Sequence, residues 1–251
     1  MIQTKAIVLS AIKFQETSLI VRCYTLEGIR SYLLRGVLKH KKKAITPAYF
    51  QPLSQLEVIT TDRNDGTLEY IKEVKVSYPY KNLHQSVIRS SVLFFLAEIG
   101  GSVLQEEVPN AALFSFWEKN LQWYDRAEHF ANFHLKFLID LTFYLGVLPN
   151  TSAIELPFFD LEAGVFVAMH NGHFLMSESE SLLLKFFLTH SIEEVSQLKM
   201  SREERNDLLE QLLNYYRWHL PAFKTPHSWA VLKTLISTCF LRNFIVLLWR
   251  G

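Results

Sequence analysis

Cysteine is scarce in this chain, and no long uncharged apolar run is found in it. The 251 residues include only Cys23 and Cys239, which excludes the dense disulfide framework of small secreted domains. We expect no secretory leader at the N-terminus, because Lys13 interrupts its first apolar stretch. The last 17 residues contain Arg242 and are too short to span a bilayer comfortably. We therefore expect a cytoplasmic protein with no membrane partner.

Motifs of common enzyme classes are also missing. The chain has no G-x-x-x-x-G-K-[ST], G-x-G-x-x-G, G-x-S-x-G or H-E-x-x-H segment, so nucleotide-binding, hydrolase and zinc-protease interpretations lose their usual support. His170 and His173 flank an expected turn and have no cysteine nearby to complete a zinc site. Asp160 and Glu162 have no matched acid–base partner and fit a solvated loop. We expect no catalytic residue, no cofactor and no bound metal.

The net charge of +1 hides two unlike parts of the chain. Residues 1–80 contain 12 Lys or Arg against 7 Asp or Glu, whereas residues 81–251 contain 14 against 18. The first part is therefore basic and the second acidic, which predicts different partners for the two. We expect a domain boundary near residue 80.

Five short segments before Pro79 have the composition of β-strands. In the last of them, apolar residues alternate from Leu68 to Tyr78, the period of a half-buried strand. Glu27-Gly28 and Asp65-Gly66 supply hairpin turns. So many short strands in about 80 residues favour a small barrel, because closure removes exposed sheet edges. The expected strands cover residues 3–12, 17–26, 29–36, 54–61 and 67–78.

After Pro79 the apolar period changes to that of α-helices. Helices are expected over 85–105, 111–125 and 129–146. Three serines, each followed by a glutamate three residues later, predict capping boxes at helix starts: Ser177 with Glu180, Ser191 with Glu194, and Ser201 with Glu204. Between these helices, residues 165–176 predict a β-hairpin with its turn at Asn171-Gly172. The chain is thus predicted to be α+β, with a mainly helical second domain.

A basic stretch follows the third expected strand. No acidic residue occurs between Glu27 and Glu57, and a run of cations in this interval is suited to phosphate contacts, although such runs are also common in solvated loops. Two strands before it alternate cations and rings, a pattern typical of single-stranded nucleic-acid binding. The candidate nucleic-acid-binding residues are Arg35, Lys39, Lys41, Lys42 and Lys43, together with Arg22, Tyr24, Arg30 and Tyr32.

Several ordered segments resemble the bacterial recombination mediator RecO. They are TKAIVLSAIKFQETSLIVRCYTLEGIRSYLLRGVLKHKKK, then QPLSQLEVI, FYLGVLPN, FFDLEAGVF and YYRWHLP, and they run in order along residues 1 to about 235. The resemblance implies an N-terminal five-stranded OB-fold barrel followed by a helical domain. It also implies binding of single- and double-stranded DNA, strand annealing, and help in loading RecA.

The resemblance further implies two protein partners, RecR and the acidic C-terminal tail of the single-strand-binding protein. For the tail, the expected helix over 129–146 is the candidate, and Lys136 is its only Lys or Arg. One departure concerns zinc. Many relatives carry a four-cysteine zinc ribbon around residues 150–176, where this chain has no cysteine, so zinc is not carried over.

Two other functions remain open on the sequence alone. An RNA-binding barrel protein would use the same electrostatics, and contacts to the 2′-hydroxyl would distinguish it. A protein adaptor would dock the lysines on an acidic partner. Neither alternative requires catalysis.

Overall fold

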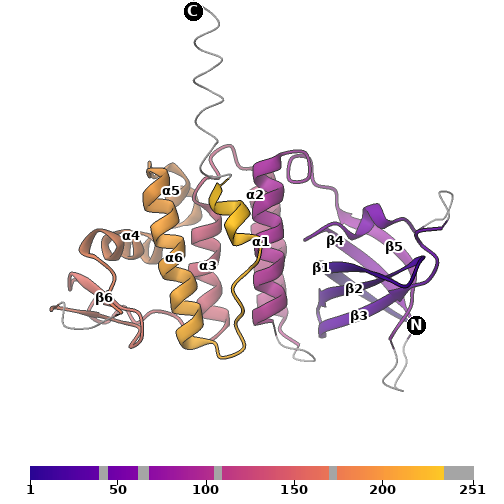
Figure 1. Ribbon diagram of the computed structural model, residues 1–251, viewed down its shortest axis with the longest axis horizontal. Coiled ribbons are helices and arrows are strands. Elements are labelled where there is room, and N and C mark those ends of the chain that lie inside the picture. The colour runs from indigo at the N-terminus through magenta and orange to yellow at the C-terminus, as the bar shows by residue number, and fades with distance from the viewer. Residues whose placement is uncertain (40–44, 62–67, 105–108, 170–173, 235–251) are drawn as a thin grey trace, which may run out of the picture. The chain divides into compact units, whose positions relative to one another are not determined.

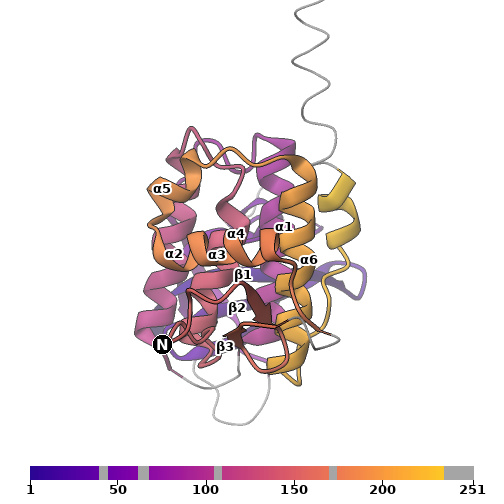
Figure 2. The same ribbon diagram turned by 90° about the vertical axis from the view of Figure 1, so that its left-hand side faces the viewer.

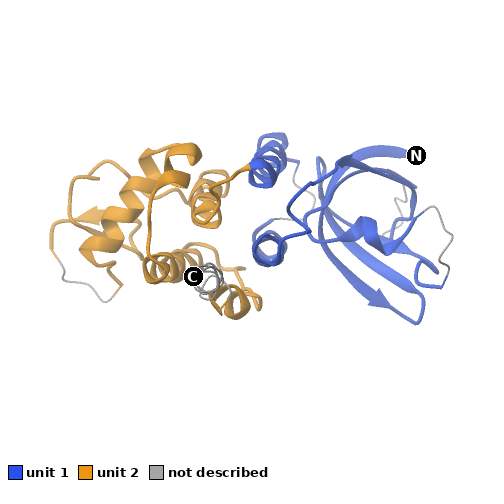
Figure 3. Cartoon of the chain, turned by 90° about the horizontal axis from the view of Figure 1, so that it is seen from above, with its two compact units in different colours: residues 1–126 blue, residues 127–251 orange. Residues whose placement is uncertain are grey.

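The computed structural model describes residues 1–39, 45–61, 68–104, 109–169 and 174–234 (Figure 1). The chain divides into two compact units, residues 1–126 and 127–251 (Figure 3). The first unit includes two helices as well as the sheet, and the domain boundary expected near residue 80 stays a prediction.

Five antiparallel strands form the sheet of the first unit: β1 (Ile2–Phe14), β2 (Ser18–Thr25), β3 (Gly28–Leu34), β4 (Gln55–Thr60) and β5 (Ile71–Tyr78). Their order is β3-β2-β1-β4-β5, and the sheet curls round on itself (Figure 3). A parallel bridge between Tyr32 and Glu69, and a bond of 2.8 Å from the Leu33 N–H to the Glu69 carbonyl, join its two edges. The predicted five-stranded OB-fold barrel is confirmed. The turn predicted at Asp65-Gly66 lies outside the described residues.

Apolar side chains from all five strands fill the barrel. The short 3-10 helix η1 (Pro47–Phe50) adds Phe50 from one end. The thiol of Cys23 lies within this interior, where burial raises its pKa to about 12, so it stays protonated at neutral pH. The interior residues are Ala6, Val8, Leu19, Val21, Cys23, Tyr32, Leu34, Val37, Phe50, Leu56, Val58 and Ile71.

Helices α1 (Val87–Val103) and α2 (Ala111–Arg126) complete the first unit. A Cβ added at Gly100 of α1 would lie 3.0 Å from Leu9 of β1 and 3.0 Å from the ring of Trp117 in α2. Glycine therefore allows close packing where helix, strand and indole meet, since a larger residue would need Leu9 or Trp117 to shift. At the other end of β1, Lys5 pairs with Glu118 of α2 at 2.9 Å.

The buried carboxylate of Asp125, at the end of α2, fixes the segment that follows β5. It accepts backbone N–H groups from Lys81 at 3.0 Å, Asn82 at 2.8 Å and Leu83 at 3.1 Å, and its side chain is fully enclosed. A buried N–H without an acceptor costs about 1–3 kcal/mol, and of these three groups the N–H of Leu83 is buried while those of Lys81 and Asn82 are partly buried. Asp125 thereby joins α2 to the chain between barrel and helices.

Four helices make up most of the second unit: α3 (Phe133–Tyr144), α4 (Glu178–Thr189), α5 (Ile192–Gln197) and α6 (Arg202–His219). The three predicted capping boxes are confirmed, at Ser177, Ser191 and Ser201. Helix α3 packs against the other three, and α4 runs across the direction of α6 (Figure 2). Within the described part of the chain, no helix has the length and apolar character needed to cross a bilayer.

The hairpin predicted over residues 165–176 is wrong in its strand pairing. Strand β7 (Val165–Val167) pairs with β6 (Phe158–Asp160), and residues 174–176 contact the other side of β6, where Leu175 bridges to Asp160. The turn lies at 161–164, because Asp160 Oδ1 accepts the N–H groups of Glu162 and Ala163, both at 2.9 Å. Asn171-Gly172, the predicted turn, lies outside the described residues.

Aromatic packing holds this small sheet in place. The ring of Phe159 lies 4.9 Å from that of Phe166 and 5.8 Å from that of Tyr215 in α6. The Phe159 N–H donates to the Ser181 hydroxyl of α4 at 2.9 Å. Hydrogen bonds and rings thus link the sheet to two helices at the position where the family resemblance places a zinc ribbon.

His134 in α3 is a buried base within the second unit. Its side chain is enclosed and Nε2 has no partner among the described residues. Burial lowers the pKa of the imidazole to about 3, and the charge of Arg205 adds to this effect. His134 is therefore neutral in the folded protein at neutral pH.

Replacing Asp125 by alanine should lower the free energy of unfolding by about 1–3 kcal/mol, since the buried N–H of Leu83 and the partly buried N–H groups of Lys81 and Asn82 lose their acceptor. Urea denaturation followed by tryptophan fluorescence measures this. The Asp125→Asn variant keeps one carbonyl acceptor and should fall between wild type and alanine. Equal stability of all three proteins would contradict the role given to the carboxylate.

The stability of the second unit should fall as pH drops from about 6.5 towards 4. The unfolded chain takes up a proton at His134 near its ordinary pKa of about 6.5, whereas the folded chain does so only near 3. Stability from the neutral imidazole is thus present above pH 6.5 and lost on acidification. Thermal melting of His134→Leu should show a smaller loss between pH 7 and 4 than wild type, and an identical pH profile would refute the assignment.

Candidate nucleic-acid interface

A hollow of about 380 Å³ lies where the end of β3 meets the start of β5. We name it the basic groove and define it by its lining residues: Leu33, Leu34, Arg35, Val37, Ile45, Tyr70, Ile71 and Lys72. Its lining includes two cations and no anion. The basic groove forms where the barrel closes. There the Leu33 N–H donates to the carbonyl of Glu69, which lies just before the start of β5.

A cation and a ring form the accessible part of the groove. The guanidinium carbon of Arg35, an exposed residue, lies 4.9 Å from the centre of the Tyr70 ring, a cation–π geometry. Thr61 fixes the backbone of Tyr70, because its hydroxyl accepts a hydrogen bond from the Tyr70 N–H at 3.3 Å. Lys72 is exposed on the same rim. Cations beside a ring suit a phosphate chain whose bases are unstacked.

The predicted lysine segment is joined to this groove at both ends. Val37 and Ile45, on either side of it in the chain, both line the groove. Lys39 is exposed and its N–H bonds to the Gly36 carbonyl at 3.3 Å. Lys41, Lys42 and Lys43 lie outside the described residues. The assignment of the four lysines to phosphate contacts stays a prediction.

Arg22 and Tyr24 of β2 point towards the helices. Arg22 donates to the Gly101 carbonyl of α1 at 3.0 Å. Tyr24 is 2% exposed, and its ring packs 5.6 Å from that of Phe114 in α2. Burial raises the pKa of its hydroxyl to about 12. The expectation that Tyr24 stacks on a base is therefore corrected, because α2 covers its ring.

Arg30 and Tyr32 of β3 lie on the opposite face from Arg22 and Tyr24. The hairpin pairs Val21 with Tyr32 and Cys23 with Arg30, so Tyr32 belongs to the barrel interior, where it is 1% exposed. Stacking by Tyr32 is corrected for this reason. Arg30 is half-buried and donates to its neighbour Ile29 at 3.4 Å. The four predicted residues thus do not form one binding face.

The turn between β2 and β3 predicts which residues of the two strands share a face of the sheet. Thr25 pairs with Gly28 across a two-residue connection, so even-numbered positions of β2 oppose odd-numbered positions of β3. Opposed residues share a face of a sheet. The Glu27-Gly28 turn in the sequence therefore already implied that Tyr24 and Tyr32 point to different sides.

Lys136 is a poor candidate for the acidic-tail partner. It is 7% exposed in α3 and its ammonium group lies 2.6 Å from the carboxylate of Asp140 on the next turn. Burial raises the pKa of Asp140, and the hydrogen bond and charge of Lys136 partly counteract this. A buried cation that already has an anion offers little to a second carboxylate.

Tyr70 and Lys72 are groove residues that the sequence reasoning missed. They lie in the segment predicted as a strand, and alternation there indicated only which residues face the core. The usable signal was topological, since closing the barrel between its third and fifth strands places residues 69–72 beside 33–37. In the described residues, no group of three or more His, Cys, Asp or Glu could hold a metal, and His170 and His173 lie outside them.

Comparison with known proteins assigns a family to both parts of the chain. Residues 1–80 match the family described as Recombination protein O N terminal, and residues 84–228 match Recombination protein O C terminal. The chain belongs to the RecO family. The resemblance noted in the sequence is thereby confirmed, and the basic groove lies within the N-terminal region of a RecO-family chain.

Curated relatives match over nearly the whole RecO-family chain. A protein of Flavobacterium psychrophilum is 43% identical over 237 residues, which cover 94% of this chain and 99% of the relative. Proteins of Flavobacterium johnsoniae and Phocaeicola vulgatus are 42% and 38% identical, each over 94% of this chain and 99% of the relative. All three bear the name DNA repair protein RecO.

Replacing both Arg35 and Lys72 by alanine should weaken binding to single-stranded DNA and lower the salt slope by up to about 1.4, since each phosphate contact contributes roughly 0.7. Fluorescence anisotropy titrations at several salt concentrations measure the slope. The double replacement of Lys75 and Lys119 removes the same charge from exposed positions outside the groove. If both double variants lost the same affinity and the same salt slope, the assignment of phosphate contacts to the basic groove would be contradicted.

Proposed function

We propose that this chain is a DNA repair and recombination mediator. It binds single- and double-stranded DNA with little dependence on sequence, anneals complementary strands, and assists RecA loading together with RecR. The observation that carries the proposal is the basic groove of a RecO-family barrel, in which Arg35 lies over Tyr70 with Lys72 on the rim.

Phosphate contacts supply the affinity in this proposal. Arg35, Lys39 and Lys72 are all exposed, and cations at such positions release counterions condensed on a nucleic acid. Their charges attract a backbone whatever bases it carries. The Tyr70 ring can stack on any base, because every base has a π face. Binding that is independent of sequence follows from this set of groups.

Annealing requires charge neutralisation rather than bond-making chemistry. Two complementary strands repel each other through their phosphates, and a protein that neutralises one backbone lowers this repulsion while its bases stay free to pair. The proposal therefore includes no catalytic residue. It also needs no cofactor, since the groups that act are Arg, Lys and Tyr side chains.

The protein partners in the proposal are RecR and the acidic tail of the single-strand-binding protein, with RecA reached indirectly. Their support is the family to which the chain belongs. Lys136 is not assigned to the tail, because Asp140 already holds its ammonium group. A titration of the full chain with DNA and RNA oligomers of one length and sequence tests the choice of DNA, since tighter RNA binding would favour 2′-hydroxyl contacts instead.

Replacing Lys39, Lys41, Lys42 and Lys43 together by alanine should slow annealing of complementary oligonucleotides. The salt slope for a single strand should also fall by roughly 0.7 for each lost contact, over up to four contacts. Stopped-flow fluorescence of a labelled strand pair measures the annealing rate, and anisotropy measures the slope.

A matched control removes four exposed lysines elsewhere: Lys81, Lys119, Lys199 and Lys224. This control should anneal nearly as fast as wild type. If the control and the test variant lose the same rate and slope, net charge alone drives the effect and the site assignment fails. If wild type does not accelerate annealing at low salt, the proposed function is wrong.

A further inference from the structure

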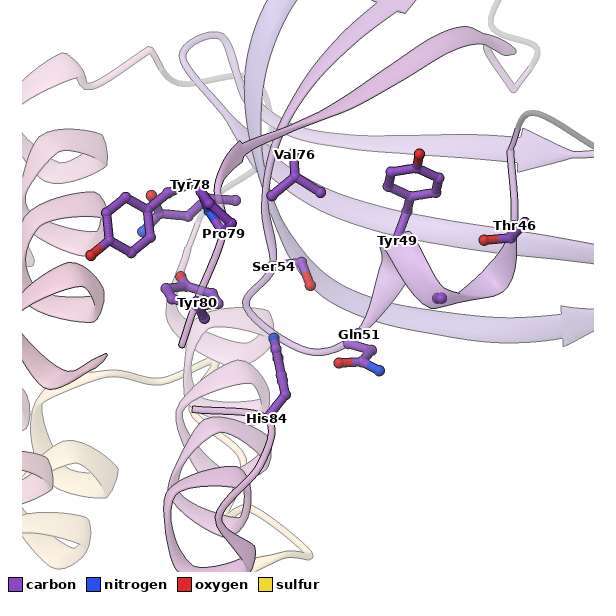
Figure 4. A pocket seen from close by; sticks show the side chains of 11 residues that line it. Thr46, Tyr49, Gln51, Ser54, Val76, Tyr78, Pro79, Tyr80 and His84 are labelled. Carbon is purple, nitrogen blue, oxygen red and sulfur yellow. The ribbon is translucent and has the colours of Figure 1, made fainter. Parts of the chain in front are cut away.

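A second hollow, of about 400 Å³, lies in the first unit away from the cations. We name it the aromatic hollow. Tyr49 of η1 stands on one side of it, and Tyr78 and Tyr80 stand on the other, with Val76 and Ser54 between them (Figure 4). A hollow of this volume falls in the range of about 300–1,000 Å³ that is usual for small-molecule sites.

Charge distinguishes this hollow from the basic groove. None of the residues that line it is Lys, Arg, Asp or Glu. Its polar groups are neutral donors and acceptors, among them the amide of Gln51 and the hydroxyls of Thr46 and Ser54. Burial also lowers the pKa of His84, which favours the neutral imidazole. Neither a phosphate nor an acidic peptide would find a counter-charge here, whereas a flat uncharged ring with polar edges would find suitable groups.

The walls of the aromatic hollow are fixed before any ligand arrives. Tyr80 donates its hydroxyl to the Leu53 carbonyl at 2.9 Å, and its ring lies 5.5 Å from those of Tyr78 and His84. Leu53 has a φ of 59° and is fully buried, so packing holds the turn beside Ser54 in a rare conformation. Such fixed walls reduce the entropy that a ligand must lose on binding.

The aromatic hollow and the basic groove share two stretches of chain. Ile45 lines the groove and Thr46 lines the hollow. On β5, Lys72 lines the groove and Tyr78 lines the hollow, which at about 3.3 Å per residue is a separation on the order of 20 Å. A single strand that occupies roughly 4–16 nucleotides on an OB-fold is long enough to reach both.

We propose that the aromatic hollow receives an unstacked base of the same single strand whose phosphates lie in the basic groove. The proposal rests on the proposed function, because it needs a nucleic acid in the groove. The Tyr49 ring contacts a face of the base, and the neutral polar groups of Thr46, Gln51 and Ser54 meet its edges. The cations of the basic groove then hold phosphates, and the uncharged aromatic hollow holds a base.

The test compares two strands of equal length, one with thymine at every position and one with abasic sites throughout. Both carry the same phosphates, so their ratio of affinities isolates the contribution of bases. In the Tyr49→Leu variant, this ratio should fall by roughly 5- to 100-fold, the value expected for one stacked base. Affinity for the abasic strand and the salt slope should stay at the wild-type values.

The matched control is Tyr49→Phe, which keeps the ring and should keep the wild-type ratio. An unchanged ratio in the leucine variant would overturn the base site and leave the aromatic side chain of a protein partner as its ligand. An equal loss of affinity for both strands in the leucine variant would also overturn it, since Tyr49 would then only support the fold. If wild type binds neither strand at low salt, the proposed function itself fails, and the base site with it.

Discussion

The buried carboxylate of Asp125 is the interaction on which the first unit depends. It accepts three consecutive backbone N–H groups directly after Tyr80, and the side chain of Asn82 returns a bond of 2.7 Å to the Asp125 carbonyl. These bonds fix the path of the chain from β5 to the start of α1. Because Tyr78, Tyr80 and His84 lie on that path, the same carboxylate also sets the wall of the aromatic hollow.

The helices of the first unit decide which parts of the barrel remain accessible. Helix α1 packs on β1 through Gly100, and α2 covers Tyr24. The Tyr24 ring is therefore covered, and Arg22 donates to the Gly101 carbonyl of α1, although the sequence pattern assigned both residues to nucleic acid. The side where β3 meets β5 keeps Arg35, Tyr70 and Lys72 accessible. One hollow of the small barrel is therefore lined by two cations and a ring, and the other is lined by uncharged groups alone.

Much of the fold was predictable because its signals are local. Capping boxes at Ser177, Ser191 and Ser201 depend on residues three positions apart, and the five strands were found from alternation and turn residues. The hairpin partner of β7 was mispredicted, since Asn171-Gly172 resembles a turn more strongly than the segment 161–164 does. The turn at 161–164 depends on Asp160, whose side chain accepts two backbone N–H groups. A single aspartate in a sequence does not predict such a turn.

The sequence by itself determined the approximate positions of the five barrel strands and of the capped helices, the excess of cations before residue 80, and the presence of Arg35 and Lys39 beside a strand end. Only the tertiary structure decided which rings are covered, that Lys136 faces Asp140 in a buried pair, and that Tyr70 and Lys72 join Arg35 in one groove. The physical reason is that alternation tells apart the two faces of a strand but does not say what packs against either. That outcome depends on contacts between residues far apart in the chain, such as Leu33 with Glu69 and Tyr24 with Phe114.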